Sequence, residues 1–141
     1  MAVLCLVVLK DCSQKDKNIM DITEIKYTAS TRGYFYQVKV MPTIMQIRMD
    51  RSLKDGQVFP IEIEEWDALL GLIEDIELKK LHNMEAATSW QETDRAAIAG
   101  LAVMTIDRKF ESPVFDHGNP PEEIKSLVNA LLELAEMTIE Y

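Results

Sequence analysis

The sequence has few of the residues from which metal centres and disulfide frameworks are built. It contains two cysteines and two histidines in 141 residues. Cys5 and Cys12 match no zinc-ligand spacing, and two cysteines cannot form the disulfide framework of a small secreted domain. A metal site would need more ligands than one histidine and scattered acids, and His82 and His117 lie far apart in the chain. We therefore expect no metal and no other cofactor.

Several functional signatures are also missing. The sequence contains no Gly-x-Ser-x-Gly nucleophile elbow and no glycine-rich phosphate loop, and it has five glycines in all. No apolar run reaches the roughly 18 residues that a membrane-spanning helix needs. These absences leave no complete catalytic set, and we assign no catalytic residue from the sequence.

Basic residues are outnumbered, 15 to 24, which gives a formal net charge of -9. Neutralising phosphates requires clustered lysine and arginine, so nucleic acid is excluded as the expected partner. The acidic excess lies in residues 61–141, whose net charge is -12, whereas residues 1–60 have a net charge of +3. Two solvated acidic helices explain this asymmetry; an acidic docking face for a basic partner is the alternative.

The length allows one domain with one core. Alternating or β-rich patterns predict four strands, and Asp55-Gly56 is a strong hairpin signal before the fourth. The four strands cover residues 22–29, 34–40, 44–49 and 58–63. Because the connections are short, an antiparallel meander is the economical topology.

Helical spacing of apolar residues predicts a helix over residues 64–76, with Trp66 as a core anchor, and another from Pro121 to about Met137. Between them lies an apolar strand, residues 96–106, with a return strand to residue 115. The sequence thus predicts an α+β fold: an antiparallel sheet with both helices on one face, in the order ββββαββα, to which an N-terminal strand could be added.

Residues 1–21 are open to two interpretations, and residues 22–141 form the expected domain. Residues 2–9 are either a buried strand or the end of a secretory apolar region. In the second case Cys12 is a lipid-attachment site and the following polar residues are a tether. No basic residue precedes the apolar run, and Asp11 stands where a small residue is wanted, so the local pattern favours the strand.

The stretch from Phe115 to Glu123 predicts a tight corner between a strand and a helix. Asn119 is suited to the N-cap and Pro120 to the first helical position, while Gly118 permits a positive φ. Asp116 and His117 are adjacent here, and a carboxylate beside an imidazole could orient a general base. The structural alternative is that Asp116 accepts backbone N–H groups within the turn.

Other polar and aromatic residues could join this corner. Arg32 could pair with Asp94 or Asp116, and if these residues meet near His117 they would form a small polar pocket. Trp90 lies in a polar loop and is either an exposed interaction residue or a buried anchor.

Four segments together resemble a family of small uncharacterised proteins from Bacteroidetes, many of which look like secreted lipoproteins. The resemblance covers about residues 22–137. It rests on Ser30-Thr31-Arg32-Gly33-Tyr34-Phe35, the Trp66 helix, Asp94 before a strand of small residues, and Phe115-Asp116-His117-Gly118-Asn119-Pro120-Pro121. It implies a location in the cell envelope and lipidation at Cys12, and it implies no activity.

The sequence therefore favours a non-enzymatic binding or interaction module of the cell envelope, with a protein or a small ligand as its partner. Contact with a membrane would come only through a lipid anchor. The alternatives are a small hydrolase or lyase that uses Asp116 and His117, and an intracellular, cytoplasmic adaptor domain.

Overall fold

The computed structural model describes residues 21–52, 56–85 and 97–140. Within these ranges a mixed set of strands and helices forms one sheet and one helical layer. The elements are β1 (Ile22–Ser30), β2 (Phe35–Val40), β3 (Ile44–Arg48), β4 (Gln57–Pro60), α2 (Ile63–Glu74), the 3-10 helix η1 (Leu78–Asn83), β5 (Ile98–Thr105), β6 (Lys109–Glu111), β7 (Phe115–Asp116), the 3-10 helix η3 (Glu122–Ile124) and α3 (Lys125–Ile139).

The sheet is antiparallel, and its strand order is β4-β3-β2-β1-β5-β6, with β7 paired to the start of β5. The first four strands form the expected meander. The fifth does not continue it: β5 pairs with β1, so that Ile25 lies between Val40 on one side and Val103 on the other. The segment from α2 onward returns the chain across the sheet, and β1 becomes a central strand.

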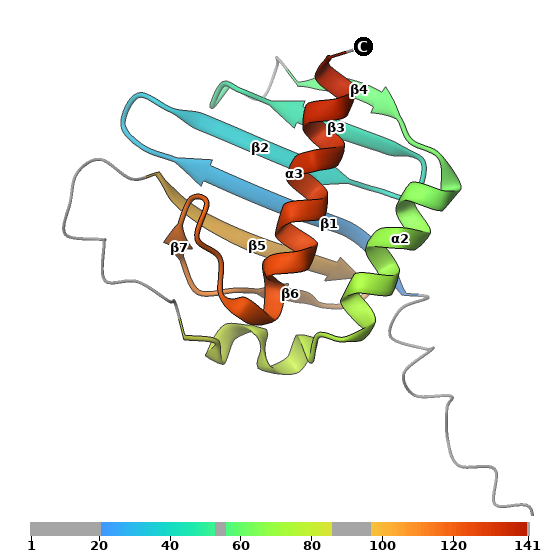
Figure 1. Cartoon of the computed structure of the whole chain (residues 1–141), viewed down its shortest axis with the longest axis vertical. Helices are drawn as coiled ribbons and strands as arrows, with labels where there is room; N and C mark the ends of the chain where they lie inside the picture. The colour runs from blue at the N-terminus through green and yellow to red at the C-terminus, as the bar shows by residue number, and fades with distance from the viewer. Residues whose placement is uncertain (1–20, 53–55, 86–96, 141) are drawn as a thin grey trace, which may run out of the picture.

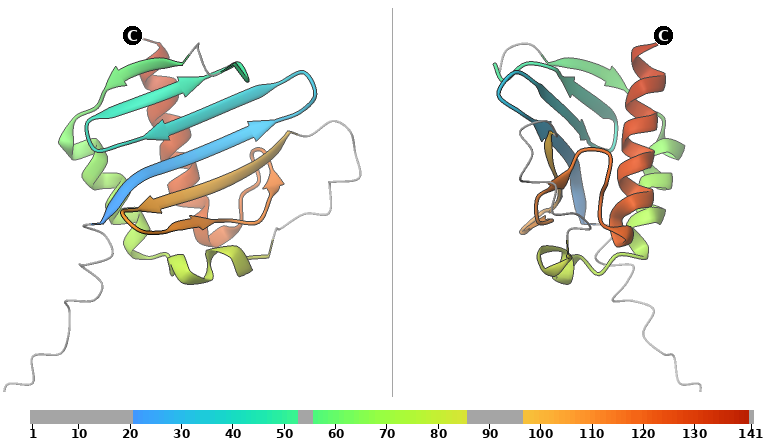
Figure 2. Two further views of the ribbon diagram at one scale, coloured as in Figure 1. Left: turned by 180° about the vertical axis from the view of Figure 1, so that it is seen from behind. Right: turned by 60° about the vertical axis from the view of Figure 1, so that its left-hand side comes forward.

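Both long helices cover the same face of the sheet, with α3 crossing the central strands and α2 beside it (Figure 1). Figure 2 shows the sheet from behind, where the helices lie on the far side. The predicted α+β class, with two helices on one face, is confirmed. The open face carries polar side chains on β1, β2 and β3, which alternate with buried ones as period-2 strands require.

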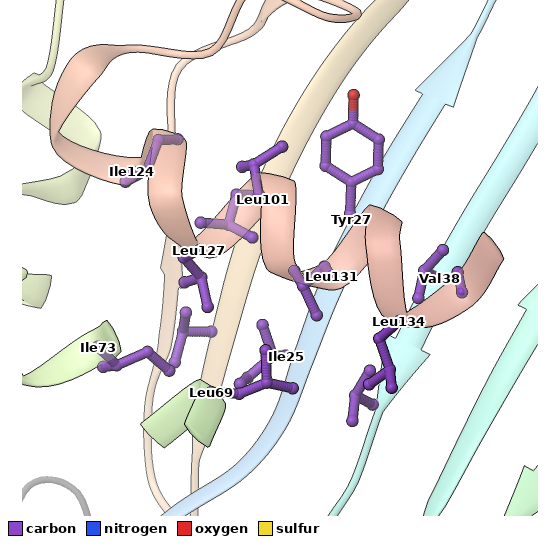
Figure 3. Close-up of a cluster of buried hydrophobic side chains, with 14 of the residues drawn as sticks. Ile25, Tyr27, Val38, Leu69, Ile73, Leu101, Ile124, Leu127, Leu131 and Leu134 are labelled. Atoms are coloured by element: carbon purple, nitrogen blue, oxygen red, sulfur yellow. The ribbon is translucent and has the colours of Figure 1, made fainter. Parts of the chain in front are cut away.

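The core lies between the sheet and the two helices (Figure 3). Alternate residues of the strands meet one stripe of each helix, because both patterns place their apolar residues on a single face. The largest fully buried side chains are Tyr27, Phe115, Ile25, Met45, Leu81, Leu101, Ile124, Leu127, Leu131, Val38, Val40 and Val103. The Tyr27 hydroxyl points away from the leucine and isoleucine cluster, toward the edge of the core (Figure 3).

Helix α2 begins one residue before the predicted position. Its N-cap is Glu62, whose side chain and that of Glu65 form a reciprocal capping box with the backbone of the first turn. The Glu65 carboxylate accepts the backbone N–H of Glu62 at 2.8 Å. Trp66 is buried with Leu69 and Ile73 on one stripe, which confirms its role as a core anchor.

The strand-to-helix corner forms, but its predicted cap is wrong. Gly118 has φ of +88°, as the turn requires, whereas Asn119 does not cap the helix. The residue at the N-cap of η3 is Pro121, which is extended with φ of -51° and ψ of 145°. A proline disfavours the α conformation of the residue before it, so Pro121 keeps Pro120 out of the helix. Helical structure therefore starts only at Glu122, and α3 follows at Lys125.

No helix within the described ranges is long and apolar enough to cross a membrane. Residues 1–20 lie outside these ranges, as do Trp90 and Asp94. The two interpretations of the N-terminal segment, the lipidation of Cys12 and the role of Trp90 therefore remain predictions.

Candidate functional site

A hydrogen bond joins the first strand of the sheet to the corner before α3. The hydroxyl of Tyr27 and Nδ1 of His117 are 2.7 Å apart. The rings also approach each other at the same place, with 5.9 Å between their centroids, and Tyr34 lies 6.1 Å from the imidazole on another side. His117 is therefore held among aromatic side chains, although its own ring is exposed to solvent.

The direction of this bond follows from the burial of the tyrosine. Tyr27 is 0% exposed, and burial, together with the nearby Tyr34 and Tyr36, raises the pKa of its hydroxyl well above the ordinary range. The hydroxyl thus keeps its proton, and a buried O–H without an acceptor is costly. Its partner among the described residues is Nδ1 of His117, so the hydroxyl donates and Nδ1 accepts. In a neutral imidazole the proton then resides on Nε2.

The backbone fixes the position of the imidazole as well. The N–H of His117 donates to the carbonyl of Ala97 at 2.8 Å, beside the pairing of β7 with β5. The N–H of Asn119 donates to the carbonyl of Asp116 at 2.9 Å, which closes the turn around Gly118. The corner is thus tied to the sheet through β7 and the backbone N–H of His117, and the turn that follows is closed by its own hydrogen bond.

A cleft of about 500 Å³ opens beside His117. We call it the His117 cleft, and its walls come from four parts of the chain: the turn into β2, the end of β3, the corner and α3. Its lining residues are Gly33, Tyr34, Phe35, Tyr36, Met49, His117, Leu132, Glu136 and Ile139. This volume lies within the range of small-ligand sites, which are mostly apolar and contain a few polar groups.

Helix α3 contributes three residues to the cleft at helical spacing. Leu132, Glu136 and Ile139 are four and three residues apart, so they lie on one face of the helix. Glu136 brings the one carboxylate among the described residues that line the cleft. Burial, then Tyr34 and then Glu136 raise the pKa of the Tyr36 hydroxyl. The carboxylate is thus close enough to the aromatic wall to act on it electrostatically.

The residues predicted from the sequence are placed differently from one another. His117 lines the cleft, whereas Arg32 is exposed in the β1–β2 turn and is not among the lining residues. Its neighbours Gly33 and Tyr34 do line the cleft. Asp116 is 7% exposed in β7 and likewise does not line it. Asp94 lies outside the described residues, so the pocket predicted for all four side chains remains a prediction.

Sequence reasoning missed four of the residues described for this site. Tyr27, Tyr34, Tyr36 and Glu136 were assigned to strands and to a helix without a functional role. A hydroxyl on the core face of a buried strand needs a hydrogen-bond partner, and Tyr27 met that criterion in the sequence. The identity of the partner, 90 positions further along the chain, had no local signal.

The protonation state of the imidazole decides which chemistry the cleft can support. A general base needs an unprotonated ring nitrogen that faces its substrate, with the other nitrogen donating to an orienting group. Here Nδ1 accepts from Tyr27, and Nε2 carries the proton. The imidazole therefore acts as a hydrogen-bond donor toward a ligand, and the raised pKa values of Tyr27 and Tyr36 keep those two hydroxyls neutral.

A second, larger groove of about 710 Å³ lies at the opposite end of the core, between the end of α2 and the β5–β6 turn. Its rim is charged, with five carboxylates and two cations: Asp21, Glu74, Asp75, Glu77, Asp107, Lys79 and Arg108. Within the described ranges no three His, Cys, Asp or Glu side chains are grouped so that they could hold a metal. The His117 cleft is the better candidate because it combines aromatic walls with a positioned imidazole and one carboxylate.

Comparison of the sequence with protein-family models gives no match, and neither does comparison with curated proteins.

Proposed function

We propose that this protein is a non-catalytic binding module whose ligand occupies the His117 cleft. The observation that carries the proposal is the convergence of two distant sequence motifs on one concave site. Gly33, Tyr34 and Tyr36 come from the turn and strand after Arg32, and His117 comes from the corner before α3. The segments Ser30 to Phe35 and Phe115 to Pro121 both belong to the resemblance to the Bacteroidetes family, and both contribute lining residues to the cleft.

The positioning of the imidazole supports binding. A recognition site needs polar groups whose orientation is fixed before the ligand arrives, because ordering them on binding costs free energy. His117 is fixed through Nδ1 by Tyr27 and through its backbone by Ala97. Its Nε2–H is then a preorganised donor at the edge of an apolar cavity.

The same arrangement argues against the catalytic alternative. For a hydrolase or lyase that uses Asp116 and His117, the carboxylate would have to accept from Nδ1–H. The Nδ1 atom instead forms its hydrogen bond with Tyr27. Under the binding hypothesis, replacing His117 lowers the affinity for a ligand and does not abolish a catalytic reaction.

A fragment screen followed by two-dimensional amide NMR tests the proposal. Fragments of about 15 heavy atoms or fewer should shift the backbone signals of residues 33–36 and 117 and those of the second half of α3. Tyr34→Ala and His117→Ala should each weaken the bound fragments at least fivefold. Ile106→Ala is the matched control, because Ile106 is 77% exposed at the β5–β6 turn and does not line the cleft. A screen whose hits shift other regions alone would overturn the proposal.

Location in the cell envelope is a separate proposal that rests on the resemblance. Mass measurement and N-terminal sequencing of the protein from its native host would test it. A chain that begins at a lipid-modified Cys12 supports the envelope location, and an unmodified chain that begins at Met1 supports the adaptor alternative.

A further inference from the structure

Aromatic side chains and, among the described lining residues, the carboxylate of Glu136 line the His117 cleft. The chemical class of its ligand is a further question, and the answer rests on the binding function proposed for the cleft. We infer that the cleft binds a small organic cation, in which a substituted ammonium group carries an apolar chain with a hydrogen-bond acceptor for the Nε2–H of His117. The occupant is thus a free small molecule, with its charge between Tyr34, Tyr36 and Glu136.

The aromatic wall suits a cation because the face of a tyrosine ring is electron-rich. A cation within about 6 Å of a ring centroid is attracted, and groups of aromatic rings are a known means of binding quaternary ammonium ions. Tyr34 is 43% exposed, so its ring is open to a ligand, and Tyr36 is half-buried beside it in the cleft. The two residues offer their rings without a large change of the fold.

Glu136, the charged carboxylate among the described lining residues, agrees in sign with a cationic ligand, whereas the guanidinium of Arg48, which is 5.8 Å from the centroid of the Phe35 ring, is not a lining group. Glu136 lines the cleft from α3 together with Tyr34 and Tyr36, and after burial and Tyr34 it also raises the pKa of the Tyr36 hydroxyl. None of the described lining residues is a lysine or an arginine. The guanidinium of Arg51 instead donates to the carbonyl of Thr31. The net charge of -9 adds a long-range field that attracts cations and repels anions.

The remaining walls suit an alkyl chain. Met49, Leu132 and Ile139 line the cleft with flexible or branched apolar side chains, and Met49 is 63% exposed. Methionine adapts to irregular apolar surfaces, so it can cover chains of different shape. A ligand with both a charged head and an apolar chain would use both halves of the cleft, whereas a bare inorganic cation would use one.

Titration with three probes that share a six-carbon chain tests this inference. They are hexyltrimethylammonium, hexanol and hexanoate. Binding of each probe is measured from the amide NMR signals of residues 33–36, 117 and 132–139. We expect hexyltrimethylammonium to bind about five- to tenfold more tightly than hexanol. Hexanoate should bind most weakly, because its carboxylate is repelled by Glu136 and receives no cation–π attraction.

Two variants separate charge from shape. Glu136→Gln should remove most of the preference for the cation and leave the affinity for hexanol unchanged within a factor of two. Tyr34→Leu keeps an apolar side chain and removes the aromatic face. It should therefore lower the affinity for hexyltrimethylammonium more than the affinity for hexanol. Glu133→Gln is the matched control, because Glu133 is exposed on the same helix and does not line the cleft.

The outcomes distinguish this inference from the proposed function. Equal binding of all three probes at the cleft leaves the binding function intact and overturns the cationic class. A preference for the cation that Glu136→Gln leaves unchanged would also overturn that class. No binding of any probe up to about 20 mM contradicts the proposed function and this inference together. Tighter binding of Nα-acetyl-lysine methylamide than of hexyltrimethylammonium would assign the ammonium group to a protein side chain and overturn the small-ligand form.

Discussion

The hydroxyl of Tyr27 on the first strand lies 2.7 Å from Nδ1 of His117 in the corner before the last helix. The two residues are 90 positions apart, and their hydrogen bond crosses from the buried sheet face to the rim of the cleft. One bond thus satisfies a buried polar group and sets the tautomer of an exposed imidazole. The hydroxyl oxygen of Tyr27 thus serves both the packing of the core and the orientation of the His117 imidazole.

Tyr27→Phe should destabilise the protein by about 1 kcal/mol, the net value of a typical intramolecular hydrogen bond. The ring remains, so no cavity forms in the core. Urea denaturation measures the loss. Nitrogen-15 NMR of the imidazole should show the proton on Nε2 in the parent protein and a mixture of tautomers in the variant. Tyr34→Phe is the control, since Tyr34 touches the imidazole by its ring. An unchanged tautomer in Tyr27→Phe would contradict the assigned direction of the bond.

The strands and helices followed from local patterns, whereas the pairing of β5 with β1 did not. Residues 34–40 and 44–49 alternate between apolar and polar positions, and this period specifies strands with one buried face. The apolar run at residues 96–106 indicated a central strand, but nothing in it identified the neighbouring strand. The choice depends on where the chain arrives after α2, which is a property of the whole fold.

The corner shows where local reasoning fails. Asn119 has the side chain of a good N-cap, but the two prolines after it impose a stronger steric restriction on the backbone. Pro121 has a fixed φ and disfavours the α conformation at Pro120, so the helix starts after both. Steric exclusion thus outweighs a capping bond of about 1 kcal/mol. The positive φ of Gly118 was foreseeable, because a tight turn between a strand and a helix often needs a positive φ and glycine adopts it without strain.

The candidate site could be predicted only in part. His117 was identified because it is one of two histidines in the chain. Tyr34 was assigned only to a strand, because its alternating pattern indicated nothing more. Glu136 was one acidic residue among many on a solvated helix, and nothing in its spacing separated it from Glu133. Glu136 reaches the cleft because of the angle at which α3 crosses the sheet. This angle is set by the packing of the buried leucines of α3 against the strands, and the sequence of the helix alone does not give it.

Gly118→Ala and Gly71→Ala should change stability in opposite directions. Gly118 has φ of +88°, in the left-handed region of backbone conformations. A residue with a side chain is about 1–2 kcal/mol less stable in this region, so Gly118→Ala should destabilise the protein. Gly71 lies inside α2, where an added Cβ would meet nothing within 4 Å. Alanine there should stabilise the protein by about 0.5–1 kcal/mol through its better helix propensity. Thermal and urea unfolding of both variants measure the two shifts, and destabilisation by Gly71→Ala would refute the assigned environment.

Leu131→Ala and Met137→Ala compare a buried and an exposed position of the same helix. Leu131 is 0% exposed beneath α3, and its truncation should cost about 2–5 kcal/mol, since it removes apolar burial and leaves a cavity. Met137 is 56% exposed, and its truncation should change stability by about 0.5 kcal/mol or less. The free energy of unfolding from urea titration is the measurement. Equal costs would mean that α3 does not pack on the sheet through the stripe shown in Figure 3.

Stability should fall at alkaline pH, and Tyr27→Phe should reduce the fall. Burial is the main cause that raises the pKa of both Tyr27 and Tyr36 in the folded protein, whereas an unfolded tyrosine titrates near pH 10. Below about pH 10 both states keep these protons, so the stabilisation is fully present. Above it the unfolded chain releases them first, binds fewer protons than the folded state, and is favoured by up to about 1.4 kcal/mol per pH unit for each tyrosine.

Urea denaturation from pH 8 to pH 11 measures that slope. Lysine deprotonation also contributes in this range, but it contributes equally to the parent protein and to Tyr27→Phe, so their difference isolates the tyrosine. The variant, which lacks the most buried ionisable hydroxyl, should lose less stability between pH 10 and pH 11 than the parent does. Parallel curves for the two proteins would show that the Tyr27 hydroxyl titrates normally. That result would contradict the burial that raises the pKa of this hydroxyl.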